Sequence, residues 1–420
     1  MQRGASVPER HEMPTSPRVF NVGAASVDIT PTVPLPLAGY GDRAGPYTRV
    51  ADRLEANIAV FRQSETVVVF VSCDLLFVGP SLRGRLEALL ADLVAAENLF
   101  VSATHTHFAP ATNLAIPRLG QASHEYVEKV ALDISAMVRS LLATALPMAV
   151  VEQRSGYANS AIHRRLPVTR LRFGFPPWGR RWEMRPNEAV AVDNRIRVLT
   201  IETTDGRPVA VCWSYACHPV CYPDKTQVSA DFPGVVREAI RARLGNIPVL
   251  FWQGFSGDVR PRSLAASALP AFGAFTTEQW RGWSEGLAAS VLEAMQAPGE
   301  TLAGRMTLGR RQLALAELGL NGGNRNITIH EVRLGDGLEV FGISAEPVNA
   351  YVAKLEAARP GSTVIPVGCI DDVPCYLPTD EMVAQGGYEV TGFRKLFGVS
   401  GRFRRGIEAR IEREFGPTGT

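Results

Sequence analysis

The chain lacks any apolar run of the roughly 20 residues that a membrane-spanning helix requires. It also lacks an excess of charge of either sign, because 44 basic residues face 42 acidic ones for a formal net charge of +2. Without a basic field, the composition favours neither nucleic acid nor an anionic membrane surface as a partner, and it predicts no stable membrane anchor. With 46% hydrophobic and 20% charged residues, the 420-residue chain has the composition of a globular protein.

Cysteine is scarce. The six cysteines form no Cys-x-x-Cys pair, and Cys217-x3-Cys221 has no matching second half, so a structural zinc site is not expected. The first twenty residues are charged and contain no apolar core of a secretion signal. We therefore expect a disordered leader at 1–18 and reduced thiols in a cytoplasmic protein.

No internal repeat or low-complexity linker divides the chain. Short runs rich in Val, Ile and Phe alternate with stretches of helical periodicity, which predicts an α/β fold in one large domain, with a mixed β-sheet flanked by helices. The predicted helices cover 82–97, 124–146, 229–244, 276–295 and 346–358. Asp231 is placed as the N-cap of the third helix, and Thr276 lies at the start of the fourth.

The stretch 99–110 begins as a short apolar run, predicted to be a buried strand, and continues into His105 and His107. Sheets of α/β proteins bind ligands at the C-terminal ends of their strands. In an extended segment, residues i and i+2 point to the same side, so both imidazoles are expected to face one cavity. One could bind a metal while the other hydrogen-bonds a reacting group, although such a pair can also simply close a strand.

Three further polar side chains, His218, Glu346 and Tyr376, stand near the ends of predicted strands in separate parts of the chain. Two imidazoles and one carboxylate form a catalytic zinc set that leaves a position open for water. Read singly, His218 could cap a strand, Glu346 could be a carboxylate at a helix N-terminus, and Tyr376 could be a core aromatic. The sequence therefore predicts a metal site at strand ends and leaves these alternatives open.

The segment 164–187 breaks the regular pattern, because it mixes seven arginines with Phe173, Phe175, Trp178, Trp182 and a Pro-Pro pair. It is too irregular for a regular element and too aromatic for a disordered linker. Two interpretations remain equal: a loop or lid over a cleft, and an insertion packed on the surface.

Several motifs occur in the order found in one known family. The segment Ser102-Ala-Thr-His105-Thr-His107 resembles the zinc motif of neutral ceramidases, the non-lysosomal amide hydrolases that split ceramide. Further similar segments are Ala216-Cys-His218-Pro219, Gly257-Asp258-Val259-Arg260-Pro261, Ser344-Ala-Glu346-Pro, Tyr376-Leu-Pro-Thr379, Tyr388-Glu389 and the stretch 159–164. The resemblance covers roughly residues 20 to 400, and several motifs in one order are far more specific than any single one. It implies that residues 19–415 form the catalytic domain.

The resemblance implies roles for individual residues. Zinc would be bound by His105, His218, Glu346 and Tyr376. Around the scissile carbonyl, His107 would move the proton, while Tyr388 and Arg164 would hold the oxyanion. The loop residues Gly257, Asp258 and Arg260 would line the substrate. Asp231 and Asp258 are also candidates to orient the imidazoles, or are plain cap and turn residues.

The chain departs from the family at two points. Where the family loop carries a serine, this chain has Arg260, and Ser256 lies on the wrong side of Gly257-Asp258. A metal-water mechanism is therefore expected in place of a serine-dependent one. The chain ends at Thr420, without the immunoglobulin-like domain of full-length ceramidases, and together with the missing secretion signal this makes a membrane sphingolipid a poor candidate substrate.

These observations favour a zinc-dependent hydrolase of a carboxamide bond in a small-molecule N-acyl substrate, smaller or more polar than ceramide. One alternative keeps the metal but performs acyl transfer or ring closure, with an amine in place of water. Another is a binding protein on the same fold without activity. Arg260 is expected to favour an anionic substrate group, or else to form an internal ion pair with Asp258 or another carboxylate.

Overall fold

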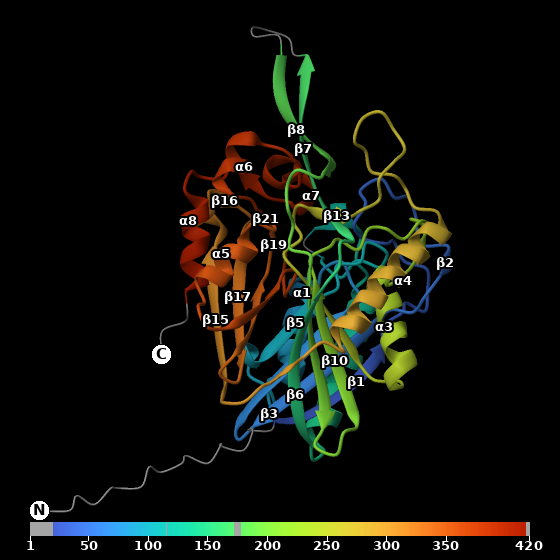
Figure 1. The fold of residues 1–420 in the computed structure, drawn as a ribbon, viewed down its shortest axis with the longest axis vertical. Coiled ribbons are helices and arrows are strands. Elements are labelled where there is room, and N and C mark those ends of the chain that lie inside the picture. Colours follow the sequence, from blue (N-terminus) through green and yellow to red (C-terminus); the bar gives the residue numbers. More distant parts are fainter. Residues whose placement is uncertain (1–19, 115, 172–177, 417–420) are drawn as a thin grey trace, which may run out of the picture.

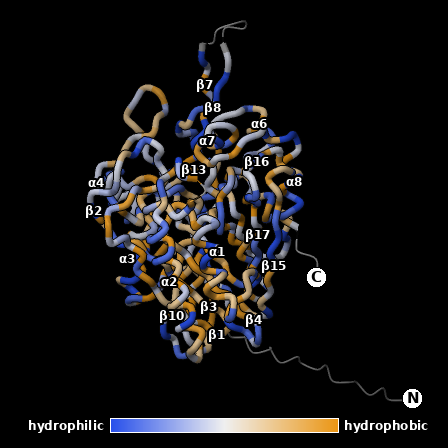
Figure 2. The backbone as a smooth tube through the Cα atoms, turned by 180° about the vertical axis from the view of Figure 1, so that it is seen from behind, coloured by the Kyte–Doolittle hydropathy of each residue, from blue (hydrophilic) through white to orange (hydrophobic). Residues whose placement is uncertain are grey.

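The computed structural model describes residues 20–114, 116–171 and 178–416, so the expected leader at 1–18 lies outside the described residues. Two sheets pack face to face, and helices cover their outer faces (Figure 1). The strands of both sheets carry most of the strongly hydrophobic segments, which gather in the interior in Figure 2. The mixed α/β class predicted from the sequence is therefore confirmed.

The larger sheet has nine strands in the order β12-β10-β9-β6-β1-β3-β4-β5, with β14 paired to β6. Its strands are β1 (Phe20–Asp28), β3 (Glu55–Gln63), β4 (Thr66–Cys73), β5 (Leu99–Ala103), β6 (Met148–Tyr157), β9 (Arg195–Thr203), β10 (Pro208–Tyr215), β12 (Val249–Gln253) and β14 (Glu300–Thr301). Within this sheet, only β4–β5 and β10–β12 are parallel. Each parallel pair needs a crossover, and a helix lies in each connection.

Four helices cover the outer face of this sheet. They are α1 (Gly79–Leu90), α2 (His124–Leu142), α3 (Asp231–Leu244) and α4 (Thr277–Ala294). The buried face of α2 repeats every fourth residue through Val130, Ile134 and Val138, and full burial of each such side chain contributes about 1.5–3 kcal/mol. As expected, Thr276 caps α4, and it does so in a reciprocal capping box with Gln279.

Helix α1 is shorter than the predicted helix at 82–97. It begins at Gly79, ends at Leu90 and is followed by a turn and by a 3-10 turn at Ala96–Asn98. Val94, which lies between the helix and the 3-10 turn, is buried, so the apolar spacing continues beyond the end of the helix. Helix α2 likewise ends at Leu142 rather than at residue 146.

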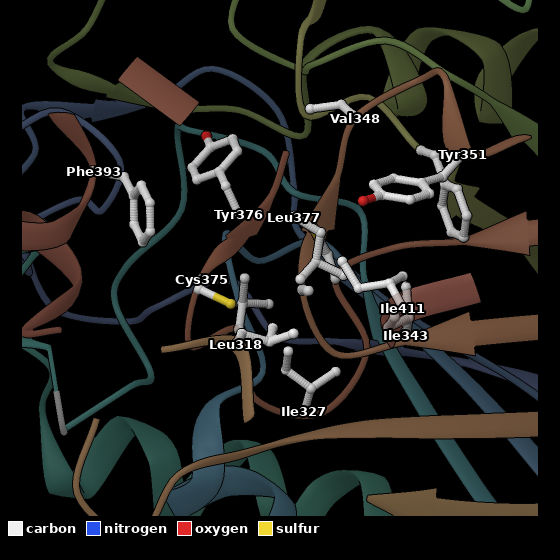
Figure 3. Packing of buried hydrophobic residues seen from close by; sticks show 14 of the residues in the cluster. Leu318, Ile327, Ile343, Val348, Tyr351, Cys375, Tyr376, Leu377, Phe393 and Ile411 are labelled. Atoms are coloured by element: carbon white, nitrogen blue, oxygen red, sulfur yellow. The ribbon is translucent and has the colours of Figure 1, made fainter. Parts of the chain in front are cut away.

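The second sheet has the order β15-β17-β18-β20 and packs its inner face against the larger sheet. It contains β15 (Met306–Ala314), β17 (Asn326–Leu334), β18 (Leu338–Ile343) and β20 (Thr363–Val367), and its other face is covered by α5 (Tyr351–Ala357) and α8 (Ile407–Glu412). Phe100 and Trp252 from one sheet share a core with Val332 and Val340 from the other. A further core on the outer side includes Leu318, Ile327 and Ile343 (Figure 3).

Short elements close the structure. They are β2 (Arg49–Val50), β11 (Gln227–Val228), β16 (Leu320–Asn321), β19 (Glu346–Pro347), β21 (Tyr376–Leu377), β22 (Ser400–Gly401), α6 (Asp380–Gln385), α7 (Arg394–Phe397), and a π-helical turn at Tyr388–Gly392, with 3-10 turns at Pro117–Leu119, Leu315–Leu318 and Arg413–Phe415. None of the described helices combines the length and apolar character needed to cross a membrane.

The sequence predicted that the segment 164–187 is irregular, and this prediction was wrong. It forms most of an antiparallel hairpin of β7 (Ala161–Leu171) and β8 (Trp178–Asn187), which rises away from the body of the molecule in Figure 1. The outer part of the ribbon is exposed or half-buried, and Arg170 pairs with Glu183 across it, so the buried alternation of a packed strand is absent there. Phe173, Phe175 and the Pro-Pro pair lie outside the described residues.

Candidate metal centre

Both parallel strand pairs lead into histidines of one cluster. His105 follows β5 by two residues, and His218 follows β10 by three. Their ring centroids are 4.9 Å apart, and that of His107 lies 5.1 Å from that of His105. One nitrogen from each ring can be chosen so that all three lie within 4.8 Å of one another. These three imidazoles can therefore bind a single metal ion.

His105 and His107 meet for a reason different from the expected one. The segment is not extended, because His105 has a φ of 68°, in the left-handed region. The chain thus turns at His105, and this turn brings the two rings together. Such a conformation costs of order 1–3 kcal/mol for a residue with a side chain, so the surrounding structure must hold it in place.

Backbone carbonyls orient all three rings. The Nδ1 atom lies 3.0 Å from the Leu76 carbonyl oxygen in His105, 3.2 Å from that of Gly39 in His107, and 3.0 Å from that of Val259 in His218. A carbonyl oxygen can only accept, so each Nδ1 carries the proton and donates it. Each Nε2 of a neutral ring therefore keeps its lone pair for a ligand.

The carboxylates of Asp231 and Asp258, which were candidates to orient these rings, bind other groups. Asp231 is not the N-cap of α3 but its first residue, and its carboxylate accepts from the Cys221 backbone N–H and from Trp280 Nε1. Asp258 Oδ2 lies 3.1 Å from His163 Nε2, while its Oδ1 accepts from the Asn349 backbone N–H. The expectation that either aspartate orients a metal-site imidazole was therefore wrong.

Glu346 and Tyr376 reach the cluster from a pair of two-residue strands. They are direct register partners in the parallel pair β19–β21, so their backbones are fixed side by side. The predicted helix at 346–358 begins only at Tyr351, and Glu346 is thus not at a helix N-terminus. Its Oε2 lies 3.1 Å from His218 Nε2 and 3.5 Å from His105 Nε2. The Tyr376 hydroxyl points away from Leu318 and Ile327 in Figure 3.

The protonation states suit a cation. Burial opposes the charge on Glu346, yet the imidazoles of His105 and His218 hold its pKa well below the usual range. Burial, together with the Arg164 guanidinium, lowers the pKa of His218 to about 4. Burial and the two neighbouring rings lower the pKa of His107 well below its usual value. At neutral pH, Glu346 is therefore an anion, and His107 and His218 are neutral.

His105 carries the remaining proton of the cluster. Burial lowers its pKa, but the Cys369 thiol and the Glu346 carboxylate outweigh burial and raise it well above the usual value. The Nε2 atoms of His105 and His107 are buried and have no hydrogen-bond partner. Metal binding releases protons from such ligands, so a bound cation would replace this proton and satisfy both atoms. The residues present therefore fit a metal ion.

Arg164 and Tyr388 border the centre, as the sequence suggested. The Arg164 guanidinium lies 5.6 Å from the ring centroids of both Tyr376 and Tyr388, and its Nε donates to Glu389 Oε1 at 2.9 Å. Its Nη1 is 3.4 Å from His218 Nε2, and its buried Nη2 has no partner. Tyr388 is half-buried, and burial with the nearby Glu346 raises its pKa to about 12. Its hydroxyl therefore remains a donor at neutral pH.

The loop 256–260 packs against the backbone that carries Glu346. The Gly257 backbone N–H donates to the Pro347 carbonyl at 2.8 Å, and a Cβ on Gly257 would lie 2.7 Å from the Glu346 carbonyl oxygen. Only glycine permits this close approach, which fixes the backbone that carries Glu346. Ser256 Oγ accepts from Gln253 Nε2 at 2.6 Å. The contacts of Gly257 and Asp258 position other residues, and their expected role in substrate binding stays a prediction.

Sequence reasoning missed three residues that adjoin His107 and Arg164. Gly39, at a φ of 100°, holds His107 Nδ1 through its carbonyl, and a Cβ there would lie 2.4 Å from that atom. The Tyr40 ring packs 5.1 Å from the His107 ring. Glu389 binds both Arg164 and Arg165. The glycine-rich stretch around Gly39 was the available signal, because closely spaced glycines often mark a tight approach of backbone to a functional side chain.

The fold places a cluster of histidines that could hold a metal ion at the strand ends, and the chain is similar to known proteins. The model of the N-terminal part of neutral/alkaline non-lysosomal ceramidases matches residues 20–244, more than half of the chain. The chain therefore belongs to this family. No curated protein matches the chain by sequence.

Two solved structures share the fold. The crystal structure of neutral ceramidase from Pseudomonas aeruginosa aligns with a TM-score of 0.75 at 16% identity, covering 94% of this chain and 73% of that one. A ceramidase complexed with C2 aligns with a TM-score of 0.74 at 15% identity, covering 94% and 74% of the two chains. These likenesses confirm the predicted ceramidase fold.

Proposed function

We propose that this protein is a zinc-dependent hydrolase that cleaves the carboxamide bond of an N-acyl compound. The observation that carries the proposal is the convergence of three imidazoles, each with Nδ1 on a backbone carbonyl, beside the buried carboxylate of Glu346. Membership in the ceramidase family supports amide hydrolysis as the reaction. The pairing of Glu346 with Tyr376 supports both as additional ligands.

Zinc suits this donor set of imidazole, carboxylate and phenol oxygen. His105, His218, Glu346 and Tyr376 would hold the ion. When bound, Zn²⁺ polarises a carbonyl and supplies a nucleophile at neutral pH by lowering the pKa of water to about 7. Glu346 Oε2 lies within ion-pair distance of His105 and His218 among the described imidazoles, which supports these two rings as the ligands and leaves His107 for another role.

The surrounding residues complete the reaction. The Tyr388 hydroxyl and the unpartnered Nη2 of Arg164 donate hydrogen bonds to the oxygen that gains negative charge at the scissile carbonyl. His107 is neutral and has a free Nε2, so it accepts a proton and passes it to the leaving amine. Ser256 is bound to Gln253 and takes no part.

We infer further that the substrate is smaller or more polar than ceramide. Arg260 stands where the family loop carries a small hydroxyl, and its guanidinium contacts only the Met184 sulfur and the Phe272 ring among the described side chains. A long uncharged lipid has no group to satisfy that guanidinium.

Metal analysis combined with a substrate panel tests the proposal. We expect about one zinc per chain and metal-dependent hydrolysis of short N-acyl compounds. Turnover that requires an added amine would instead indicate acyl transfer. Stoichiometric ligand binding by the zinc-loaded protein without turnover of any N-acyl compound would indicate a binding protein.

A further inference from the structure

The Arg260 side chain is half-buried and has no carboxylate partner among the described residues. It is on β13 (Val259–Pro261), and its only hydrogen bond among the described residues goes to Met184 Sδ at 3.5 Å. The guanidinium also lies over the Phe272 ring, 4.8 Å from the centroid. Thioether sulfur is a weak acceptor, and a ring face satisfies no N–H of the fork in full. A half-buried arginine with these partners lacks the counter-ion that a desolvated charge normally has.

An internal ion pair with Asp258 was the rival interpretation. The Asp258 carboxylate is occupied by His163 on one oxygen and by the Asn349 backbone N–H on the other. No carboxylate of the described chain lies within ion-pair distance of Arg260, whose side chain contacts the Met184 sulfur and the Phe272 ring. The matched residue Arg262, two positions along, does have a carboxylate partner, with Nη1 2.7 Å from Glu188 Oε1.

A second arginine, Arg43, packs on Tyr40 and has one nitrogen without a hydrogen-bond partner. The Arg43 guanidinium lies 4.8 Å from the Tyr40 ring centroid, and its Nε donates to the Lys225 carbonyl at 2.7 Å. Its Nη2 is buried and has no hydrogen-bond partner. Lys225 Nζ approaches the same Tyr40 ring at 4.4 Å and is also 3.8 Å from the exposed Asp42. Positive charge therefore gathers around Tyr40.

This region adjoins the candidate metal centre. The Tyr40 ring packs on His107, and its hydroxyl donates to the Val220 carbonyl at 3.2 Å. Arg260 follows Val259, whose carbonyl orients His218, and pairs in register with Ile162, two residues before Arg164. Arg260 is close enough to the Tyr40 hydroxyl to lower its pKa, although burial dominates and raises that pKa to about 12. The buried carboxylate of Asp231 is already bound by the Cys221 backbone N–H and by Trp280 Nε1.

We propose that Arg260 and Arg43, which both lie near the candidate metal centre, form an anion-binding subsite, and that the substrate carries a carboxylate or phosphate on its amine half. The proposal rests on the proposed function, because His107 beside Tyr40 is the residue that would pass a proton to the leaving amine. An anion there satisfies the free N–H groups of both guanidinium forks with charge-assisted hydrogen bonds. The substrate class is thus an N-acyl amino acid or an N-acyl amino-alcohol phosphate.

Matched substrate pairs test the subsite and separate the two anions. One pair is an N-acylglycine and its glycinamide, and the other is an N-acylethanolamine phosphate and the free N-acylethanolamine. With the zinc-loaded protein, we expect kcat/KM for the preferred anion to exceed that for its neutral partner by about tenfold or more. Arg260→Ser should remove most of this preference through KM, and Arg260→Lys should keep part of it. Arg262→Ser is the matched control and should leave the preference unchanged.

Binding is measured separately from turnover. Isothermal titration of N-acylglycine into unmodified protein and into Arg260→Ser should show affinity at least about tenfold weaker in the variant. Equal affinities, or an equal effect of Arg260→Ser on charged and neutral substrates, would refute the subsite and leave the proposed function standing. Binding that depends on Arg260 without hydrolysis of any substrate would refute the proposed function and leave the subsite standing.

Discussion

Two buried polar clusters in this protein differ in how completely their groups are paired. Beneath the second sheet, Arg359 donates from all three of its nitrogens, to Glu331, to Glu339 and to backbone carbonyls including that of Phe415. At the candidate metal centre, Nε2 of His105 and of His107 have no partner, although both atoms are equally removed from solvent. Burial alone therefore does not distinguish a functional cluster from a structural one.

The difference lies in what each cluster still lacks. A guanidinium and two carboxylates with every nitrogen bonded form a closed network, so nothing further can bind there. Ring nitrogens that converge on one point without hydrogen-bond partners form an open network, which a metal ion can complete. The comparison predicts that changes in the first cluster alter stability, whereas changes in the second alter metal content and activity.

The largest effect is expected at the metal ligands. His105→Ala or His218→Ala should reduce zinc from about one per chain to near none and abolish turnover, because each removes a ligand that the others cannot replace. Metal content by mass spectrometry and hydrolysis of an N-acyl substrate check this. The exposed His124 offers a control, since His124→Ala should change neither. Full zinc occupancy in both ligand variants would refute the assignment.

Arg359→Met is expected to show the opposite pattern. It removes the guanidinium that bridges the buried carboxylates of Glu331 and Glu339. Because Arg311 and Arg333 still pair with these carboxylates, the free energy of unfolding should fall by at most about 3–5 kcal/mol, while zinc content stays unchanged. Chemical denaturation measures the loss. Arg207→Met is the control, because its ion pair with Asp205 is exposed to solvent and such pairs contribute little to stability. Zinc loss in a folded Arg359→Met protein would contradict the separation of the two clusters.

His107→Ala tests whether all three imidazoles serve one purpose. We expect zinc to remain, because His105, His218, Glu346 and Tyr376 suffice to hold it, and turnover to fall on the order of 10²-fold or more with the loss of the proton carrier. Parallel metal and rate measurements separate the outcomes. Simultaneous loss of zinc would make His107 a ligand, and unchanged turnover would make it structural.

Much of the site could be predicted because its residues lie in short motifs that have the residue types of the family motifs. The α/β class followed from alternating apolar runs and helical periodicity, and the grouping of His105, His107, His218, Glu346 and Tyr376 followed from their places at strand ends and from the family resemblance. The structure places all five side by side.

The errors have a common physical origin. Pattern reading assumed an extended chain at His105, a helix at Glu346 and no regular element after Arg164, but long-range pairing decided each case. The carbonyls that orient the imidazoles come from Gly39, Leu76 and Val259. Backbone groups leave no signature in residue type, so the sequence suggested Asp231 and Asp258 instead.

The smallest effect is expected at Ser256, whose hydroxyl is already hydrogen-bonded to a buried side chain. Its hydroxyl is buried and bound to Gln253 Nε2 at 2.6 Å, and that nitrogen also donates to the Cys217 carbonyl at 2.9 Å. Ser256→Ala therefore removes one of two acceptors of Gln253, which should cost about 1 kcal/mol of stability and leave zinc content and most turnover intact.

A serine-dependent mechanism predicts the reverse for Ser256. In that case, Ser256→Ala would abolish turnover at constant zinc content, and an acyl group could be trapped on the unmodified serine and located by peptide mass spectrometry. Ser263→Ala, a similarly buried serine on the far side of Arg260, controls for nonspecific effects of removing a hydroxyl. Retained turnover with no trapped acyl group leaves the water nucleophile as the remaining route and places Ser256 with Arg359 among the groups that hold the fold.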